Sequence, residues 1–305
     1  MKGNKYYTIF LTIILCMNFI SCEKDNFSKK EYNIHIDEPG TLRLLIPSEE
    51  DFGGNYKSLK LTGQINQEDL DDPNVIVFMQ SAETTDMKDV SVVEGERLDG
   101  TKTPKNVITG LGLPGWNSGN YSGTLILPKD LEEYWGGGSG IKNITFPNTL
   151  RILGDFNSST ATSIVLPNSV TEIGDGAFMY CNELASITLS TNLVKIGDYA
   201  LSGTSITNIT IPDKVTEIGG MVFKYCEKLQ EVWLPQSLKE INDKAFYNCP
   251  MLKKIHIKAP IPPTNKYKGD LFDSSSYIEL FVPKGSRELY RNDPLWNVVQ
   301  YITEE

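Results

Sequence analysis

Apolar and polar positions repeat at nearly constant intervals over the second half of the chain. Short stretches in which apolar and polar residues alternate begin at Ile164, Ile187, Ile209, Val232 and Ile255, and the intervals between them are 23, 22, 23 and 23 residues. Such alternation is typical of a β-strand with one buried face. A fixed period with one strand in each repeat predicts a solenoid in which every repeat forms one rung.

Each repeat continues with the same pattern after its strand. In the repeat that starts at Ile187, Leu193, Ile196 and the pair Ala200–Leu201 recur at spacings that return them to the interior. Glycine and asparagine tolerate positive φ angles, so a conserved turn is expected where every repeat carries one of them. This predicts a left-handed turn at Gly174, Gly197, Gly219 and Asn242.

A single rung cannot stand alone, because the few side chains it buries do not offset the entropy lost by ordering its backbone. Stacking of rungs removes this free-energy deficit, because it buries both faces of each rung. The fold we expect is a leucine-rich-repeat solenoid with one parallel strand on one face per ~23-residue repeat, mainly β with short helices and turns. Caps should close its N- and C-terminal ends.

The less regular segments divide the chain into five parts. We expect a lipoprotein signal peptide at 1–21, a flexible tether at 22–36, an N-terminal capping region with irregular rungs at 37–124, repeats at 125–259 and a C-terminal cap at 260–305.

Both predicted caps contain helix signals. In the N-terminal region, Leu59–Leu61, Val75–Phe78 and Val90–Val92 have the apolar pattern of irregular rungs, and Gln67–Asp72 favours a short helix or turn. In the C-terminal region, Ser286 can cap a helix over 287–292. Trp296 can then cover the open end of the core.

The N-terminus has the features of an export signal. Lys2 and Lys5 precede an apolar run, Ile9–Ile20, which is shorter than the roughly 20 residues of a membrane-spanning helix. The run ends in Phe-Ile-Ser-Cys at 19–22, which resembles the lipobox of bacterial lipoproteins. This resemblance implies that Cys22 carries a lipid and that the protein is exported and tethered to the outer membrane. Glu23, Lys24 and Asp25 resemble the signals that send some Gram-negative lipoproteins to the cell surface. An uncleaved anchor helix is the alternative.

Three of the five cysteines, Cys181, Cys226 and Cys249, occupy the same position of their repeats, and Thr204 holds that position in a fourth. A position that accepts cysteine or threonine indicates a small buried site. A metal site would require ligands clustered at short spacing, so we expect none. Cys226 and Cys249 lie in neighbouring rungs, which leaves two alternatives: a disulfide between them or two free thiols. We favour free thiols.

Composition argues against several functions. The formal charge of −10 disfavours nucleic acid or anionic lipid as the main partner. The two histidines, His35 and His256, belong to different regions, and the acidic runs at 49–51 and 71–72 are typical of solvated loops. Residues 110–115 fit Gly-x-Gly-x-x-Gly, but loop-forming residues follow where a dinucleotide site requires a helix. We therefore expect no enzymatic activity and no cofactor.

The repeat Ile-x-Ile-Pro-x-x-Val-x-x-Ile-Gly-x-x-Ala-Phe-x-x-Cys and the terminal Val-Pro-x-Gly…Tyr…Trp resemble BspA-like bacterial leucine-rich-repeat surface proteins. The resemblance covers about residues 125–257 in the repeats. It implies a right-handed, non-catalytic solenoid on a Gram-negative cell surface that binds proteins, such as host matrix or another surface protein. We expect a monomer attached to the membrane by its lipid alone.

Outward strand positions suggest where a ligand binds. Equivalent outward residues of successive strands form one stripe across the predicted sheet. The residues of this stripe are small or β-branched in the earlier repeats, and Trp233, His256 and Phe281 then follow on consecutive strands. Glu231 and Lys254 lie beside them. Exposed aromatic residues next to charges are typical of binding hot spots. One alternative is that the loop 260–275 covers these residues. Another is a glycan-binding lipoprotein for nutrient capture, with Trp233, Tyr134 and Trp135 stacking on sugars.

Overall fold

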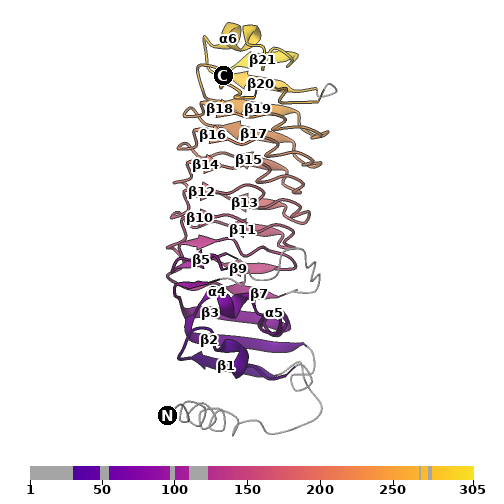
Figure 1. Ribbon diagram of the computed structural model, residues 1–305. Coiled ribbons are helices and arrows are strands. Elements are labelled where there is room, and N and C mark those ends of the chain that lie inside the picture. The colour runs from indigo at the N-terminus through magenta and orange to yellow at the C-terminus, as the bar shows by residue number, and fades with distance from the viewer. Residues whose placement is uncertain (1–29, 49–54, 97–99, 110–122, 268, 274–276) are drawn as a thin grey trace, which may run out of the picture.

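The computed structural model describes residues 30–48, 55–96, 100–109, 123–267, 269–273 and 277–305. These residues form an elongated solenoid whose rungs stack from β1 to β21, with a small helical cap at each end (Figure 1). The signal peptide with Cys22, the acidic run at 49–51 and the glycine-rich motif at 110–115 lie outside the described residues. Within the described ranges, every helix is too short or too polar to cross a bilayer.

The first strand of each rung pairs in parallel with its equivalents in the neighbouring rungs. Together they form the main face, in groups of five, two and five strands. Ile164 pairs with Ile187 and Ile209 with Val232, which confirms the predicted period. The strands are β1 (Glu31–Ile36), β2 (Tyr56–Ile65), β3 (Ala82–Val92), β7 (Thr124–Ile126), β9 (Asn143–Thr145), β11 (Ser163–Val165), β13 (Ser186–Thr188), β15 (Asn208–Thr210), β17 (Glu231–Leu234), β19 (Lys254–Ile257), β20 (Glu279–Val282) and β21 (Tyr301–Glu304).

A second parallel sheet of seven two-residue strands runs along another side of the solenoid. The sequence pattern of apolar and polar residues did not predict this second sheet, because two residues are too few to show alternation. Its strands are β6 (Val107–Ile108), β8 (Glu133–Tyr134), β10 (Ile152–Leu153), β12 (Glu172–Ile173), β14 (Lys195–Ile196), β16 (Glu217–Ile218) and β18 (Glu240–Ile241). Near the N-terminal cap, β4 (Gly95–Glu96) and β5 (Lys102–Thr103) form an antiparallel pair.

The prediction of a left-handed turn at the recurring glycine was wrong. The left-handed residues lie two positions later, at Gly176, Tyr199, Met221 and Lys244, with φ of 64°, 56°, 55° and 55°. Glycine is required at the earlier position because the neighbouring rung approaches too closely for a side chain. A Cβ on Gly219 would lie 2.4 Å from the backbone nitrogen of Asp198 and 2.4 Å from the carbonyl carbon of Gly197.

Aromatic rings form a column through the core. Phe223 and Phe246 stack with centroids 5.4 Å apart, and Phe246 and Phe272 with centroids 5.6 Å apart. Phe156 and Phe178 make an edge contact at 6.1 Å further along the solenoid. Because equivalent side chains of successive rungs meet directly, the apolar core is continuous from cap to cap.

The N-terminal cap differs from the prediction in two places. Residues 31–36, assigned to the tether, form β1, because Tyr32, Ile34 and Ile36 alternate and pack on the core. Val75–Phe78 is not a rung but part of helix α5 (Pro73–Gln80). Asp72 begins that helix by accepting hydrogen bonds from the backbone nitrogens of Asn74 and Val75, and Pro73 occupies its first position.

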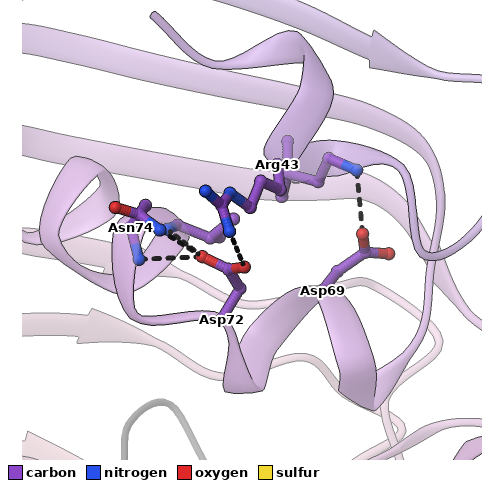
Figure 2. A network of polar contacts seen from close by, with 6 residues as sticks. Arg43, Asp69, Asp72 and Asn74 are labelled. Carbon is purple, nitrogen blue, oxygen red and sulfur yellow. Dashed lines mark hydrogen bonds and ion pairs between the residues drawn. The ribbon is translucent and has the colours of Figure 1, made fainter. Parts of the chain in front are cut away.

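Two carboxylates hold the helices of this cap together (Figure 2). Asp69 of α4 (Gln67–Asp71), a helix that the sequence predicted, is buried and accepts hydrogen bonds from the backbone nitrogens of Gly40 at 2.8 Å and Leu42 at 2.9 Å. It thereby anchors the start of α2 (Leu42–Leu45). Burial tends to raise the pKa of Asp72, but the hydrogen bonds from Asn74 and Val75 and the Arg43 guanidinium 3.3 Å away lower it overall.

The C-terminal cap closes the core as predicted. Trp296 is fully buried and meets the rings of Phe272 and Tyr290 edge-on. Helix α6 (Arg287–Asn292) forms where expected, but the Ser286 side chain does not cap it. The Ser286 hydroxyl instead donates to the carbonyl of Pro260 at 2.9 Å, which ties the helix to the last repeat.

We predict that Gly219→Ala lowers the thermal midpoint of unfolding, at a cost of roughly 1–3 kcal/mol, because the backbone of two rungs must separate. Gly176→Asn is the matched control. Its φ of 64° suits asparagine, and the nearest atom to a new Cβ is 3.8 Å away. Circular dichroism melts would test the pair. Equal midpoints for Gly219→Ala and the native protein would contradict the close-approach explanation.

Candidate binding site at the C-terminal end of the sheet

The predicted stripe of outward residues exists on the main face. Thr210 pairs with Trp233, Trp233 with His256 and His256 with Phe281, so these four side chains follow one another on consecutive strands. The neighbouring stripe runs through Glu231, Lys254 and Glu279 in the same register. The main sheet therefore brings all five predicted binding residues into one corner.

The three rings of this corner form a continuous stack. His256 lies 5.3 Å from Trp233 at an interplanar angle of 12°, and 4.3 Å from Phe281 at 5°. The His256 side chain is 14% exposed, whereas Trp233 and Phe281 keep an intermediate exposure. Stacking at the pitch of the strands thus holds three flat rings in fixed positions without burying them in the core.

Two carboxylates hold the imidazole between the outer rings. His256 Nε2 lies 2.9 Å from Glu231 Oε1, and His256 Nδ1 lies 3.0 Å from Glu305 Oε1. A neutral imidazole donates from one nitrogen only, so both contacts are hydrogen bonds when the ring is protonated. The corner is therefore an aromatic surface with an acidic border.

Glu305 is the member of this site that sequence reasoning missed. It follows β21, whose Thr303 pairs with Phe281, and this register returns the end of the chain to His256. The only signal was the alternation in residues 301–304, which is too short to assign a strand with the correct register.

The loop after the last repeat does not take the position that would cover the corner. Thr264 forms a bridge with Glu240 of the second sheet, and the backbone nitrogen of Phe246 donates to the carbonyl of Leu271. The described residues of this loop therefore extend the second sheet and the turns. Trp233 and Phe281 keep their outward faces.

Two of the residues proposed for sugar stacking do not form a platform with Trp233. Tyr134 is fully buried, and its hydroxyl donates to the carbonyl of Gly137 at 2.8 Å. Trp135 is 38% exposed, but its ring lies flat on Gly154, where a Cβ would be 2.0 Å from Trp135 Cε3. Tyrosine has the polarity of a surface residue, so the pattern alone could not show that Tyr134 belongs to the core.

The aligned cysteines are buried free thiols. Cys181, Cys226 and Cys249 donate to carbonyls of the preceding rungs, those of Phe156, Leu201 and Phe223, at 3.4, 3.2 and 3.0 Å. Thr204 Oγ1 donates to the carbonyl of Leu201 at 3.0 Å, which explains why threonine can take this position. Burial raises the pKa of Cys181 to about 12 and that of Cys226 to about 11, and it also raises the pKa of Cys249.

Among the described residues, no three histidine, cysteine, aspartate or glutamate side chains are placed to hold a metal ion. His35 lies in β1 at the opposite end from His256 in β19, and its Nε2 is 3.3 Å from Asp37. The two histidines therefore cannot act on one substrate.

Residues 154–279 match the family model for the BspA type leucine rich repeat region, in six copies. The repeats in residues 154–279 therefore have the sequence pattern of that family. The search of curated proteins found no match.

Solved structures of bacterial leucine-rich-repeat proteins are similar to this chain. A leucine-rich repeat protein from Bacteroides ovatus ATCC 8483 is 21% identical with a TM-score of 0.49; the match covers 82% of this chain and 63% of that one. A leucine rich cell surface protein from Faecalibacterium prausnitzii A2-165 is 14% identical over 82% of this chain and 83% of that one, with a TM-score of 0.34. The T. pallidum leucine rich repeat protein is 19% identical over 62% and 83%, with a TM-score of 0.33.

We predict that a chain beginning at residue 23, which keeps only these three cysteines, shows no thiol reaction with Ellman's reagent at pH 8 until it is unfolded. The thiolate is the reactive form, and both burial and the raised pKa suppress it. The raised thiol pKa values contribute their full stability below the unfolded pKa of about 9, and this contribution is lost as the pH rises toward the folded pKa, about 11 for Cys226. Stability should therefore fall as the pH rises above 9.

Cys226→Thr is the matched control, since Thr204 already fills this position in its own rung. The variant should fold, and its stability should decrease less than that of the native protein between pH 9 and 11. Rapid labelling of the native protein at pH 8 would show that the thiols are accessible and would contradict the prediction.

Proposed function

We propose that this protein is a non-catalytic, exported binding protein displayed on the cell surface, which contacts a protein partner through the corner formed by Trp233, His256 and Phe281. The partner is a host matrix protein or another surface protein. The BspA-type repeats support this proposal, since they build a rigid scaffold whose outward side chains can change without changing the fold.

The aromatic stack is the observation that carries the proposal. A partly exposed tryptophan held by its neighbours loses little side-chain entropy when it is buried in a complex. Glu231 and Glu305 each contact the imidazole at the centre of the stack, and Lys254 lies exposed on the same strand as His256. A partner that places an apolar group over the rings and a cation beside either carboxylate would match this surface.

Attachment through a lipid on Cys22 is part of the proposal. Its support is the lipobox-like sequence and the apolar run before it. A lipid on Cys22 anchors the end of the solenoid that begins with β1, whereas the strands of the aromatic corner, β17, β19 and β20, lie toward the opposite end (Figure 1). We also expect the protein to act as a monomer.

Protease shaving of intact cells that express the protein is the first test. Removal of the protein from intact cells, together with palmitate labelling that depends on Cys22, would support surface display by a lipid anchor. Protection until the outer membrane is broken would place the protein in the periplasm and exclude host matrix as its partner.

We predict that Trp233→Ala with Phe281→Ala lowers the affinity for a partner identified on a matrix-protein array by at least tenfold, because hot-spot aromatic residues contribute about 2 kcal/mol or more each. Val165→Ala is the control. Val165 lies on the same stripe and is 67% exposed, but it is distant from the corner. Surface plasmon resonance measures both variants. Unchanged affinity of the double variant for every identified partner would exclude the corner as the binding site.

A further inference from the structure

Four tyrosines, one from each of four successive rungs, lie together on the side of the solenoid formed by its turns. Tyr180, Tyr225 and Tyr247 are 55%, 43% and 36% exposed, and Tyr199 is half-buried. They follow the second-sheet strands β12, β14, β16 and β18. This surface, the tyrosine face, is therefore separate from the aromatic corner on the main sheet.

Lys224 lies at the centre of the tyrosine face. Its Nζ is 4.9 Å from the ring centroid of Tyr225, 6.0 Å from that of Tyr199 and 5.9 Å from that of Tyr247. Lys244 Nζ lies 5.7 Å from the centroid of Tyr247 in the adjacent rung. At these distances the ring faces attract the ammonium groups and hold them among the three rings.

The fold does not require aromatic residues at these positions. Tyr180, Tyr199 and Tyr225 have φ of 60°, 56° and 61°, a region that is costly for a bulky side chain. Gly203 and Asn248 hold the positions equivalent to Tyr180 and Tyr225, and Gly176 holds the position equivalent to Tyr199; glycine and asparagine adopt this conformation more easily. The tyrosines thus add backbone strain and contribute partly exposed rings, and such a combination points to a function outside the core.

The two lysines have no acidic partner within the described part of the chain. Lys57, Lys60 and Lys195 form ion pairs with carboxylates, whereas Lys224 and Lys244 contact rings only, apart from the sulfur of Met221 at 3.9 Å from Lys224 Nζ. Each ammonium group therefore keeps hydrogen-bond capacity for an anion from outside. In a chain with a charge of −10, this leaves a local cationic site on an acidic protein.

Backbone groups of the tyrosine face are already paired. The backbone nitrogens of Tyr180, Tyr199 and Tyr225 donate to the carbonyls of Ser202, Gly220 and Tyr247 in the next rung. An extended peptide therefore finds no free strand edge here, and recognition must use ring faces, phenol hydroxyls and ammonium groups. Ring faces stack on the apolar faces of sugars, and hydroxyls and ammonium groups bind sugar hydroxyls and acidic substituents.

We propose that the tyrosine face binds an anionic polysaccharide whose sugars carry carboxylate or sulfate groups. Each of four successive rungs contributes one ring, so a linear polymer of sugars that runs along the solenoid meets an aromatic residue in every rung. Lys224 and Lys244 bind its acidic groups. This ligand goes beyond the proposed protein partner, because it occupies a different side of the solenoid.

The test uses the full chain and measures its binding to polygalacturonate and to heparin by isothermal titration calorimetry. Lys224→Met keeps the apolar stem and removes the charge, and Tyr225→Asn removes the ring where a left-handed backbone favours asparagine. Each variant should weaken binding to the acidic polysaccharide at least tenfold. Tyr225→Asn should leave the melting temperature unchanged or raise it, so a loss of binding cannot be attributed to unfolding.

Three controls make the result decisive. Fully methyl-esterified polygalacturonate should not bind, because its carboxylates are masked. Lys195→Met, which removes a lysine paired with Glu172 on the second sheet, should bind as the native protein does. Trp233→Ala with Phe281→Ala should also leave polysaccharide binding intact, which separates this proposal from the protein-binding corner.

Two results would overturn the proposal. One is that neither acidic polysaccharide shows binding that depends on Lys224. The other is that poly-glutamate binds as tightly as polygalacturonate and loses binding in the same variants, since the face would then recognise acidic polypeptides.

Discussion

The parallel strand ladders determine the distance between rungs, and every other feature of the solenoid has to fit that distance. Strands in a ladder lie about 4.8 Å apart, which leaves no space for a side chain where the backbones of two rungs meet directly. Gly197 and Gly219 occupy that position. The same spacing suits flat rings, so Phe223 and Phe246 stack in the core and His256 and Phe281 stack outside it. It also brings each thiol within hydrogen-bond distance of a carbonyl in the preceding rung.

Features that repeat with the rungs could be predicted from the sequence. The period located the main-face strands from β7 to β19 and aligned Trp233, His256 and Phe281, because equivalent residues of neighbouring rungs must face each other. The sequence also indicated a short helix or turn at Gln67–Asp72, where α4 forms, and the burial of Trp296 at the open end. Each of these predictions depended on one rung resembling the next or on chemistry close in sequence.

Features that depend on contacts between rungs could not be predicted in the same way. Glycine at 219 is compatible with a left-handed turn and with a close approach, and only the position of Asp198 in the preceding rung distinguishes them. Val75–Phe78 has the apolar content of a strand, but Asp72 and Pro73 start a helix there. Glu305 reaches His256 only because β21 pairs with β20, a contact at the end of the chain for which no repeat provides a template.

The separation between inward and outward positions helps to identify function in this fold. Inward side chains are constrained by neighbours in both adjacent rungs, so an aromatic residue there is explained by packing. Outward positions have no such requirement: Thr188 and Thr210 satisfy the strand where later rungs place Trp233 and His256, and Gly203 satisfies the turn where Tyr180 and Tyr225 adopt a strained backbone. Packing does not explain aromatic residues that cluster over successive rungs at positions that smaller residues fill equally well. Both aromatic surfaces of this protein meet that criterion and lie on different sides of the solenoid, which is why we propose a separate ligand for each.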